Sequence, residues 1–137
     1  MKIDLIVGAR PNFMKIASLI NAIDKSKDKS LQYRIIHTGQ HFDKSMSQNF
    51  FDQLSIPLPD YNFKAGGGTQ AEQTGKIMVK YEEILKRKPP KICIVVGDVT
   101  STMACAIVAK KENVKVAHVE AGIRSFDLTM PEEINRM

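Results

Sequence analysis

Residues 91–101 read KICIVVGDVTS, and this stretch decides the fold class of the chain. Residues 91–96 form its most strand-like run, because four of the six are Ile or Val. Gly97-Asp98 ends the run, and a helix of small side chains is expected over roughly Ser101–Glu112. A buried strand that leads into a helix through a short glycine-containing loop is typical of a parallel α/β sheet.

The same alternation of apolar runs and helix-period segments extends in both directions from this stretch. We expect strands at Lys2–Val7, Gln32–Thr38, Tyr61–Phe63, Lys91–Val96 and Val114–Val119. We expect helices from Pro11, along Met46, Phe50 and Leu54, after the Thr69-x-x-Glu72 capping box, over Ser101–Glu112, and from Pro131. Right-handed crossovers favour the strand order 3-2-1-4-5. The pattern therefore predicts a doubly wound, Rossmann-like parallel sheet.

Composition limits the classes to which the chain can belong. It has 137 residues with 43% hydrophobic and 26% charged side chains, which is typical of one globular domain. No apolar run is long enough to cross a bilayer, and MKIDLIVGARP lacks the pattern of a signal peptide. We therefore expect a cytoplasmic protein with no membrane partner.

The charge and the cysteines favour ordinary structural roles. Lys and Arg outnumber Asp and Glu by 20 to 15, and many of the cations gather at expected helix ends. Such charges are typical of a solvated surface, so we expect no nucleic-acid partner. Cys93 and Cys105 have no metal-ligand spacing and are expected to be buried and reduced.

Ligands of open parallel sheets bind at the carboxyl ends of the strands, near the point where the strand order reverses. Arg10 and Lys15 follow the first expected strand, Asp98 follows the fourth, and Glu120 and Arg124 follow the fifth. Since the first and fourth strands would be neighbours, cations and carboxylates are expected to converge on one crevice.

Arg10 and Lys15 flank the start of a helix, where free amide groups and the helix dipole favour an anion such as a diphosphate. The alternative is a structural ion pair with Asp98 or Glu120. Gly8-x-Arg-Pro lacks the glycine spacing of a dinucleotide site. Gly66-Gly67-Gly68 is interpreted as a loop that leads to a helix cap rather than as a phosphate cradle, because no Lys follows in the required spacing.

Three carboxylates at expected loop positions, Asp98, Glu120 and Glu132, suit general acid–base chemistry. Asp98 could instead cap a helix, and Glu132 could interact with the positive end of a helix dipole in the first turn of its helix. Glu120 has the weakest structural alternative, since no helix follows it directly. His118 is expected to be a hydrogen-bonded core residue, and His41 is the better candidate for a pocket. The residues alone indicate an anion-binding α/β domain with an acid–base cluster.

Several motifs together resemble those of the non-hydrolysing UDP-N-acetylglucosamine 2-epimerases. They are Gly8-Ala9-Arg10-Pro11-Asn12-Phe13-Met14-Lys15, Gly39-Gln40-His41, Gly97-Asp98-Val99-Thr100-Ser101-Thr102, His118-Val119-Glu120-Ala121-Gly122-Ile123-Arg124 and Pro131-Glu132-Glu133-Ile134-Asn135-Arg136. The motifs occur in the order and spacing of that family and extend over the whole chain.

The resemblance implies interconversion of UDP-N-acetylglucosamine and UDP-N-acetylmannosamine by elimination and re-addition of UDP, without nicotinamide or an obligatory metal. No cofactor is therefore expected. It implies the two-domain fold of the glycosyltransferase B type, of which residues 1–137 would be an incomplete N-terminal domain. The C-terminal nucleotide-binding domain would be absent, so we expect this part alone to be inactive. A homodimer and a role in supplying surface polysaccharide precursors are also implied for the complete protein.

The resemblance also implies roles for individual residues of the matching motifs. Asp98, Glu120 and Glu132 would be the acid–base set. The contacts with the UDP-sugar would come from Arg10, Lys15, Gln40, His41 and Arg124. Two alternatives keep part of this interpretation: a transferase or hydrolysing epimerase on the same fold, and a truncated domain that binds anions without catalysis.

Overall fold

The computed structural model describes residues 1–39 and 48–137. Its elements in chain order are β1 (Lys2–Val7), α1 (Arg10–Lys25), β2 (Gln32–His37), α2 (Gln48–Leu54), β3 (Tyr61–Asn62), α3 (Gln70–Arg87), β4 (Ile92–Val96), α4 (Thr100–Lys111), β5 (Lys115–Val119) and α5 (Pro131–Arg136). The expected strand ends differ from these by at most one residue. Met46 of the expected second helix lies outside the described residues.

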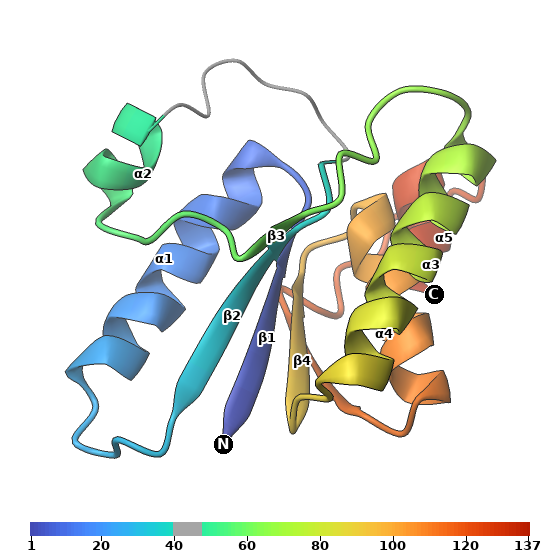
Figure 1. Cartoon of the computed structure of the whole chain (residues 1–137). Coiled ribbons are helices and arrows are strands. Elements are labelled where there is room, and N and C mark those ends of the chain that lie inside the picture. The colour runs from blue at the N-terminus through green and yellow to red at the C-terminus, as the bar shows by residue number, and fades with distance from the viewer. Residues whose placement is uncertain (40–47) are drawn as a thin grey trace.

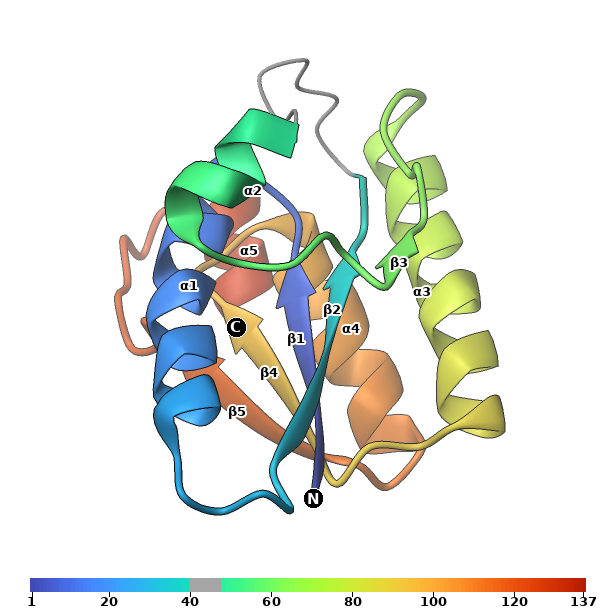
Figure 2. The same cartoon turned by 60° about the vertical axis from the view of Figure 1, so that its left-hand side comes forward.

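The five strands form one parallel sheet in the order β3-β2-β1-β4-β5, which confirms the predicted order. The central strand is β1, whose Leu5 lies between Ile35 of β2 and Ile94 of β4. Figure 2 shows how the strands fan out side by side. All their carboxyl ends therefore face the same edge of the sheet.

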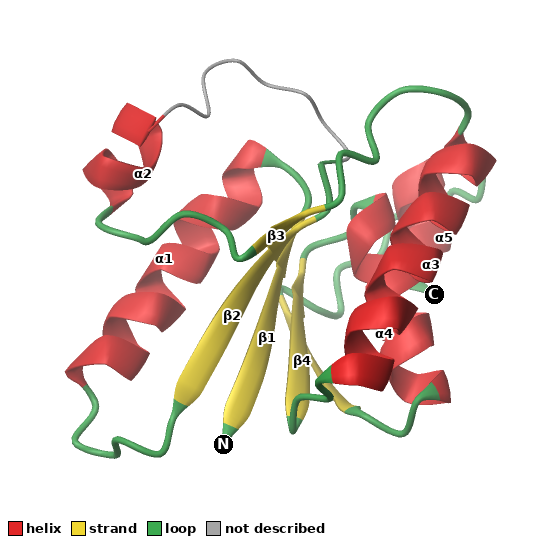
Figure 3. Cartoon of the chain, in the orientation of Figure 1, coloured by secondary structure: helices red, strands yellow, loops and turns green. Residues whose placement is uncertain are grey.

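Helices cover both faces of the sheet, as Figures 1 and 3 show. α1 and α2 pack on one face around Phe13, whose ring meets those of Phe50 and Phe51 edge to face. α3 and α4 pack side by side on the other face, over a separate cluster that includes Tyr81. The doubly wound arrangement expected from the sequence is confirmed.

α3 begins at a side-chain cap. Thr69 is its N-cap residue, and its Oγ1 accepts a hydrogen bond from the Glu72 backbone N at 3.1 Å. The exposed stretch 66–68 leads directly into this cap, and Gly67 and Gly68 both have positive φ angles. The interpretation of the glycine triplet as a loop before a helix cap is confirmed.

The face of the sheet under α3 contains a buried polar cluster. Asp4 on β1 has no exposed surface, and its carboxylate accepts hydrogen bonds from Arg34 Nε at 2.7 Å and Nη2 at 2.9 Å. The Tyr81 hydroxyl donates to the same carboxylate at 2.9 Å, and the Lys88 carbonyl accepts from Arg34 Nη2 at 2.8 Å. Burial raises the pKa of Asp4, and the contacts with Arg34 and Tyr81 oppose that effect.

The two cysteines lie in the apolar cluster between the sheet and the helices α3 and α4. Cys93 on β4 and Cys105 on α4 are both buried and free, as the sequence predicts. Burial raises the pKa of the Cys93 thiol to about 12, so this thiol remains protonated at neutral pH. In the described part of the chain, no helix is both long and apolar enough to cross a membrane.

Candidate active site

Lys15 and Glu120 meet beyond the carboxyl ends of β1 and β5, at one edge of the sheet. The Lys15 ammonium donates to Glu120 Oε2, which joins the second turn of α1 to the residue directly after β5. Both side chains remain partly exposed, at 38% for Lys15 and 43% for Glu120. A Cβ built on Gly97 would lie 4.0 Å from Glu120 Oε2, so the loop after β4 reaches the same place. The expected convergence of cations and carboxylates is therefore present for this pair.

Glu120 has a backbone conformation that non-glycine residues rarely adopt. Its φ is 60°, in the left-handed region, at the point where β5 turns into the loop that follows. This conformation costs about 1–3 kcal/mol and is found preferentially at functional sites. The surrounding structure must offset that cost to keep the carboxylate beside Lys15.

The start of α1 is held by its own side chains. Asn12 is buried, and its Oδ1 accepts hydrogen bonds from the backbone N of Gly8 at 3.0 Å and of Ala9 at 3.2 Å. Arg10 is exposed beside this turn, and its guanidinium lies over the Phe50 ring, 5.0 Å from the ring centroid. The loop between β1 and α1 is thus held by the Asn12 side chain, and the exposed Arg10 directly follows it.

Asp98 is bound by the last described helix rather than by the helix that follows it. Its Oδ2 accepts from Arg136 Nε at 3.0 Å and Nη2 at 2.6 Å, and its carbonyl accepts from Asn135 Nδ2 at 2.9 Å. The alternative that Asp98 caps a helix is wrong, because the N-cap residue of α4 is Val99, whose side chain makes no capping hydrogen bond. α5 is therefore fastened to the end of β4.

Glu133 organises the segment between Glu120 and α5. Its carboxylate has no exposed surface. It accepts from Arg124 Nε, from the Ser125 backbone N at 2.8 Å and Oγ at 3.0 Å, and from Arg136 Nη1 at 3.1 Å. Through Arg136 this carboxylate is linked to Asp98, so one buried acid connects the loop after β4 with the loop after β5.

The sequence interpretation did not select Glu133 or Arg136 as site residues. A signal for them is present, because Arg136 follows Glu133 by three positions and such residues are neighbours on a helix surface. Adjacent positions of a helix point about 100° apart, so Glu132 and Glu133 cannot face the same way. The two glutamates after Pro131 therefore have different environments: Glu132 is exposed and Glu133 is buried.

The other predicted residues have separate places. Glu132 is exposed in the first turn of α5, and no hydrogen bond or ion pair joins it to Asp98 or Glu120 in the described ranges. Arg124 binds Glu133 and lies over the Phe126 ring, 4.8 Å from its centroid. Gln40 and His41 fall outside the described residues.

His118 is half-buried, and its Nε2 lies 2.6 Å from the Gly97 carbonyl, so it is hydrogen-bonded as predicted. This bond ties β5 to the loop that precedes Asp98. Within residues 1–39 and 48–137, no group of three His, Cys, Asp or Glu side chains has the arrangement of a metal site. What the geometry offers is two carboxylates, each held by a cation, at one edge of the sheet.

The hydrogen bonds to Glu133 predict a pH dependence of stability. The Ser125 backbone N–H, followed by Arg124 and Arg136, lowers the pKa of Glu133 from 4.5 to about 2, although burial acts in the opposite direction. A carboxylate with a lowered pKa stabilises the folded chain above about pH 4.5, and this stabilisation is lost as the pH falls towards 2.

We therefore expect the stability difference between the wild-type chain and the Glu133→Gln variant to be largest near neutral pH and to shrink between pH 4.5 and 2. Urea unfolding at a series of pH values measures this difference. Other carboxylates are common to both chains, so their titration cancels. A difference that stays constant over this range would contradict the assignment of these contacts to an ionised Glu133.

Comparison with known proteins relates this geometry to a family. The family model described as UDP-N-acetylglucosamine 2-epimerase matches residues 23–137. A UDP-N-acetylglucosamine 2-epimerase homolog of Methanococcus maripaludis is 50% identical over 137 residues, which are 100% of this chain and 37% of the relative. A UDP-2,3-diacetamido-2,3-dideoxy-D-glucuronate 2-epimerase of Pseudomonas aeruginosa is 47% identical over 100% of this chain and 38% of its own length.

A solved structure agrees with the sequence matches. The crystal structure of Methanocaldococcus jannaschii UDP-GlcNAc 2-epimerase in complex with UDP-GlcNAc and UDP superposes with a TM-score of 0.91 at 45% identity. The superposition covers 99% of this chain and 37% of that one. The chain thus spans little more than a third of the length of these relatives. Because the family model matches most of the chain and the fold agrees throughout, the chain belongs to the UDP-N-acetylglucosamine 2-epimerase family.

Proposed function

We propose that the longer protein containing this chain interconverts UDP-N-acetylglucosamine and UDP-N-acetylmannosamine, and that this chain forms one wall of the active site. The observation that carries the proposal is the pair of cation-bound carboxylates at the carboxyl ends of adjacent strands. Glu120 is held by Lys15 after β5, and Asp98 is held by Arg136 after β4. Family membership supports this choice of reaction over others that use paired carboxylates.

The reaction first breaks the bond between carbon 1 of the sugar and the UDP oxygen. The proton on carbon 2 is weakly acidic because no carbonyl carbon is adjacent to it, so positive charge must develop at carbon 1 as UDP departs. Lys15 and Arg10, near the positive end of the helix dipole of α1, are suited to stabilise the leaving diphosphate. This electrostatic contribution is what we assign to the two cations.

The carboxylates then move the proton. Loss of the carbon 2 proton leaves a double bond between carbons 1 and 2, and UDP re-adds to carbon 1 while a proton returns to the other face of carbon 2. Because the proton leaves one face of carbon 2 and returns to the other, more than one acid–base group is needed. We propose Asp98, Glu120 and Glu132 for this set. Glu132 is the exposed member, on the first turn of α5.

The remaining parts of the active site belong to the longer protein. We propose that residues 1–137 are the incomplete N-terminal domain of a two-domain protein of the glycosyltransferase B type. A C-terminal domain would then supply most contacts with the uridine. Gln40, His41 and Arg124 are our further candidates for binding the UDP-sugar. We also propose that the complete protein is a cytoplasmic homodimer that supplies polysaccharide precursors.

A second substrate is favoured by one relative. The Pseudomonas aeruginosa protein is named a UDP-2,3-diacetamido-2,3-dideoxy-D-glucuronate 2-epimerase, and it is 47% identical to this chain. The same inversion at carbon 2 would apply to that sugar. The two substrates differ at carbons 3 and 6, and a carboxylate at carbon 6 would require an additional cationic contact. Both nucleotide sugars therefore belong in the assay.

The test is a product analysis with the complete protein in deuterated water. Conversion of UDP-N-acetylglucosamine to UDP-N-acetylmannosamine with deuterium at carbon 2, and no net release of UDP, is the expected result. Activity only with the diacetamido-glucuronate would select the second substrate. Free sugar plus UDP would indicate a hydrolysing epimerase, and transfer to an acceptor would indicate a transferase. The absence of all these products would contradict an enzymatic function.

A further inference from the structure

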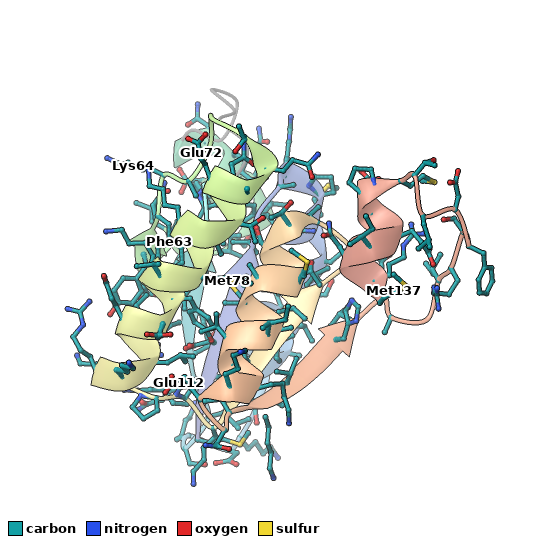
Figure 4. All side chains as sticks on the ribbon, turned by 90° about the vertical axis from the view of Figure 1, so that its right-hand side faces the viewer. Phe63, Lys64, Glu72, Met78, Glu112 and Met137 are labelled. Atoms are coloured by element: carbon teal, nitrogen blue, oxygen red, sulfur yellow. The ribbon has the colours of Figure 1, made fainter. Side chains whose placement is uncertain are left out.

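A groove of about 480 Å³ lies between β3 and α3, and none of its lining residues belongs to the candidate active site. Four cationic side chains line it: Lys64, Lys76, Lys80 and Arg87. Glu83 is the single acidic residue among them. Figure 4 shows Phe63 and Lys64 beside α3, on the side turned away from α4. The groove is thus a strongly positive surface at the free edge of the sheet.

The helical cations lie on one side of α3. Positions four and seven apart share a helix face, which brings Lys76, Lys80 and Arg87 into one row. Of the nearby acids, Glu82 pairs with Lys86 outside the groove, whereas Glu83 lines the groove itself and leaves it with three net positive charges. In the described part of the chain, none of the four groove cations forms an ion pair.

Lys64, just after the edge strand β3, has few free backbone groups. β3 is the outermost strand of the sheet, but its neighbouring residue Lys64 has its backbone groups occupied. Asn62 Oδ1 accepts from the Lys64 backbone N at 3.0 Å, and the Lys64 carbonyl accepts from Lys76 Nζ at 3.1 Å. Beside Lys64, a guest would therefore meet side-chain charge rather than free backbone groups.

The length of the cationic row selects the class of guest. Lys76 and Arg87 are eleven residues apart, which corresponds to about 16 Å along the helix axis. A single phosphate could reach only part of this row, whereas an extended peptide of about five residues would span it. A second copy of the same groove would bring like charges together, which disfavours it as the occupant.

We propose that the groove between β3 and α3 binds an extended acidic segment of a partner protein. Carboxylates of that segment pair with the cations from Lys64 to Arg87, while the half-buried ring of Tyr61 lines the groove beside them. This binding site is independent of the reaction proposed above, since the two surfaces have no residue in common.

The test is fluorescence anisotropy with the complete protein and a labelled peptide that alternates Glu and Gly. The peptide is expected to bind, and the double variant Lys80→Glu/Arg87→Glu is expected to weaken binding at least about tenfold. The matched control is Lys110→Glu/Lys111→Glu, which makes the same charge change at exposed residues in the last turn of α4. It should leave binding within about twofold of wild type. Circular dichroism verifies that both variants are folded.

Three results would overturn the proposal. Equal weakening by both double variants would mean nonspecific attraction to a basic protein. Binding of pyrophosphate that the groove variant abolishes, without binding of the peptide, would assign the groove to a small anion. A dimer in sedimentation velocity that the groove variant dissociates would assign the groove to a second copy of this chain.

Discussion

Replacement of Glu120 by Gln is expected to lower kcat for epimerisation by about 100-fold or more in the complete protein. Glutamine keeps the size of the side chain but cannot accept or return a proton. It also removes the negative charge that faces Lys15. Because the change affects the chemical step, binding of the UDP-sugar should remain close to that of wild type. Product analysis for kcat and calorimetry for UDP-sugar affinity separate the two effects.

A matched control uses a glutamate that lies elsewhere on the surface. Glu82→Gln removes the same charge from α3, where Glu82 pairs with the exposed Lys86. This variant should retain wild-type kcat, since surface ion pairs of this kind contribute little. Wild-type turnover by the Glu120→Gln protein would contradict the catalytic role of Glu120. A large loss of affinity with unchanged kcat would assign it to substrate binding instead.

Replacement of Asp4 by Asn is expected to cost this chain about 3–5 kcal/mol of folding free energy. The amide keeps the shape of the carboxylate but leaves the buried Arg34 guanidinium without its counter-charge. An unpaired charge inside a protein is costly, and total stabilities are only about 5–15 kcal/mol. Urea unfolding of the wild-type and Asp4→Asn chains measures the difference.

The double variant Asp4→Leu/Arg34→Met tests the explanation. It removes both charges and fills their place with apolar side chains, so it should be more stable than Asp4→Asn. The Tyr81 hydroxyl then loses its partner, and recovery is expected to be incomplete. If Asp4→Asn cost less than about 1 kcal/mol, the buried ion pair could not be a major contribution to stability.

Much of the fold could be predicted from local pattern. The apolar run before Gly97, the cap at Thr69 and the strand order all follow from interactions between residues that are close in sequence or from general rules of handedness. The carboxyl-end rule likewise placed Lys15, Asp98 and Glu120 at one edge of the sheet. These signals survive without tertiary information because hydrophobic periodicity specifies which face of each element is buried.

Only the tertiary structure decided which charges pair. Asp4 meets Arg34 and Tyr81 across 30 and 77 residues, and Asp98 meets Arg136 across 38. The sequence alone determined that this protein has a parallel α/β sheet with cations and carboxylates after its first, fourth and fifth strands. Electrostatic partners depend on distances of a few ångströms between distant segments, and no local periodicity encodes those distances. The contacts of Glu133 with Ser125 and of Asp4 with Arg34 were therefore visible only in the folded chain.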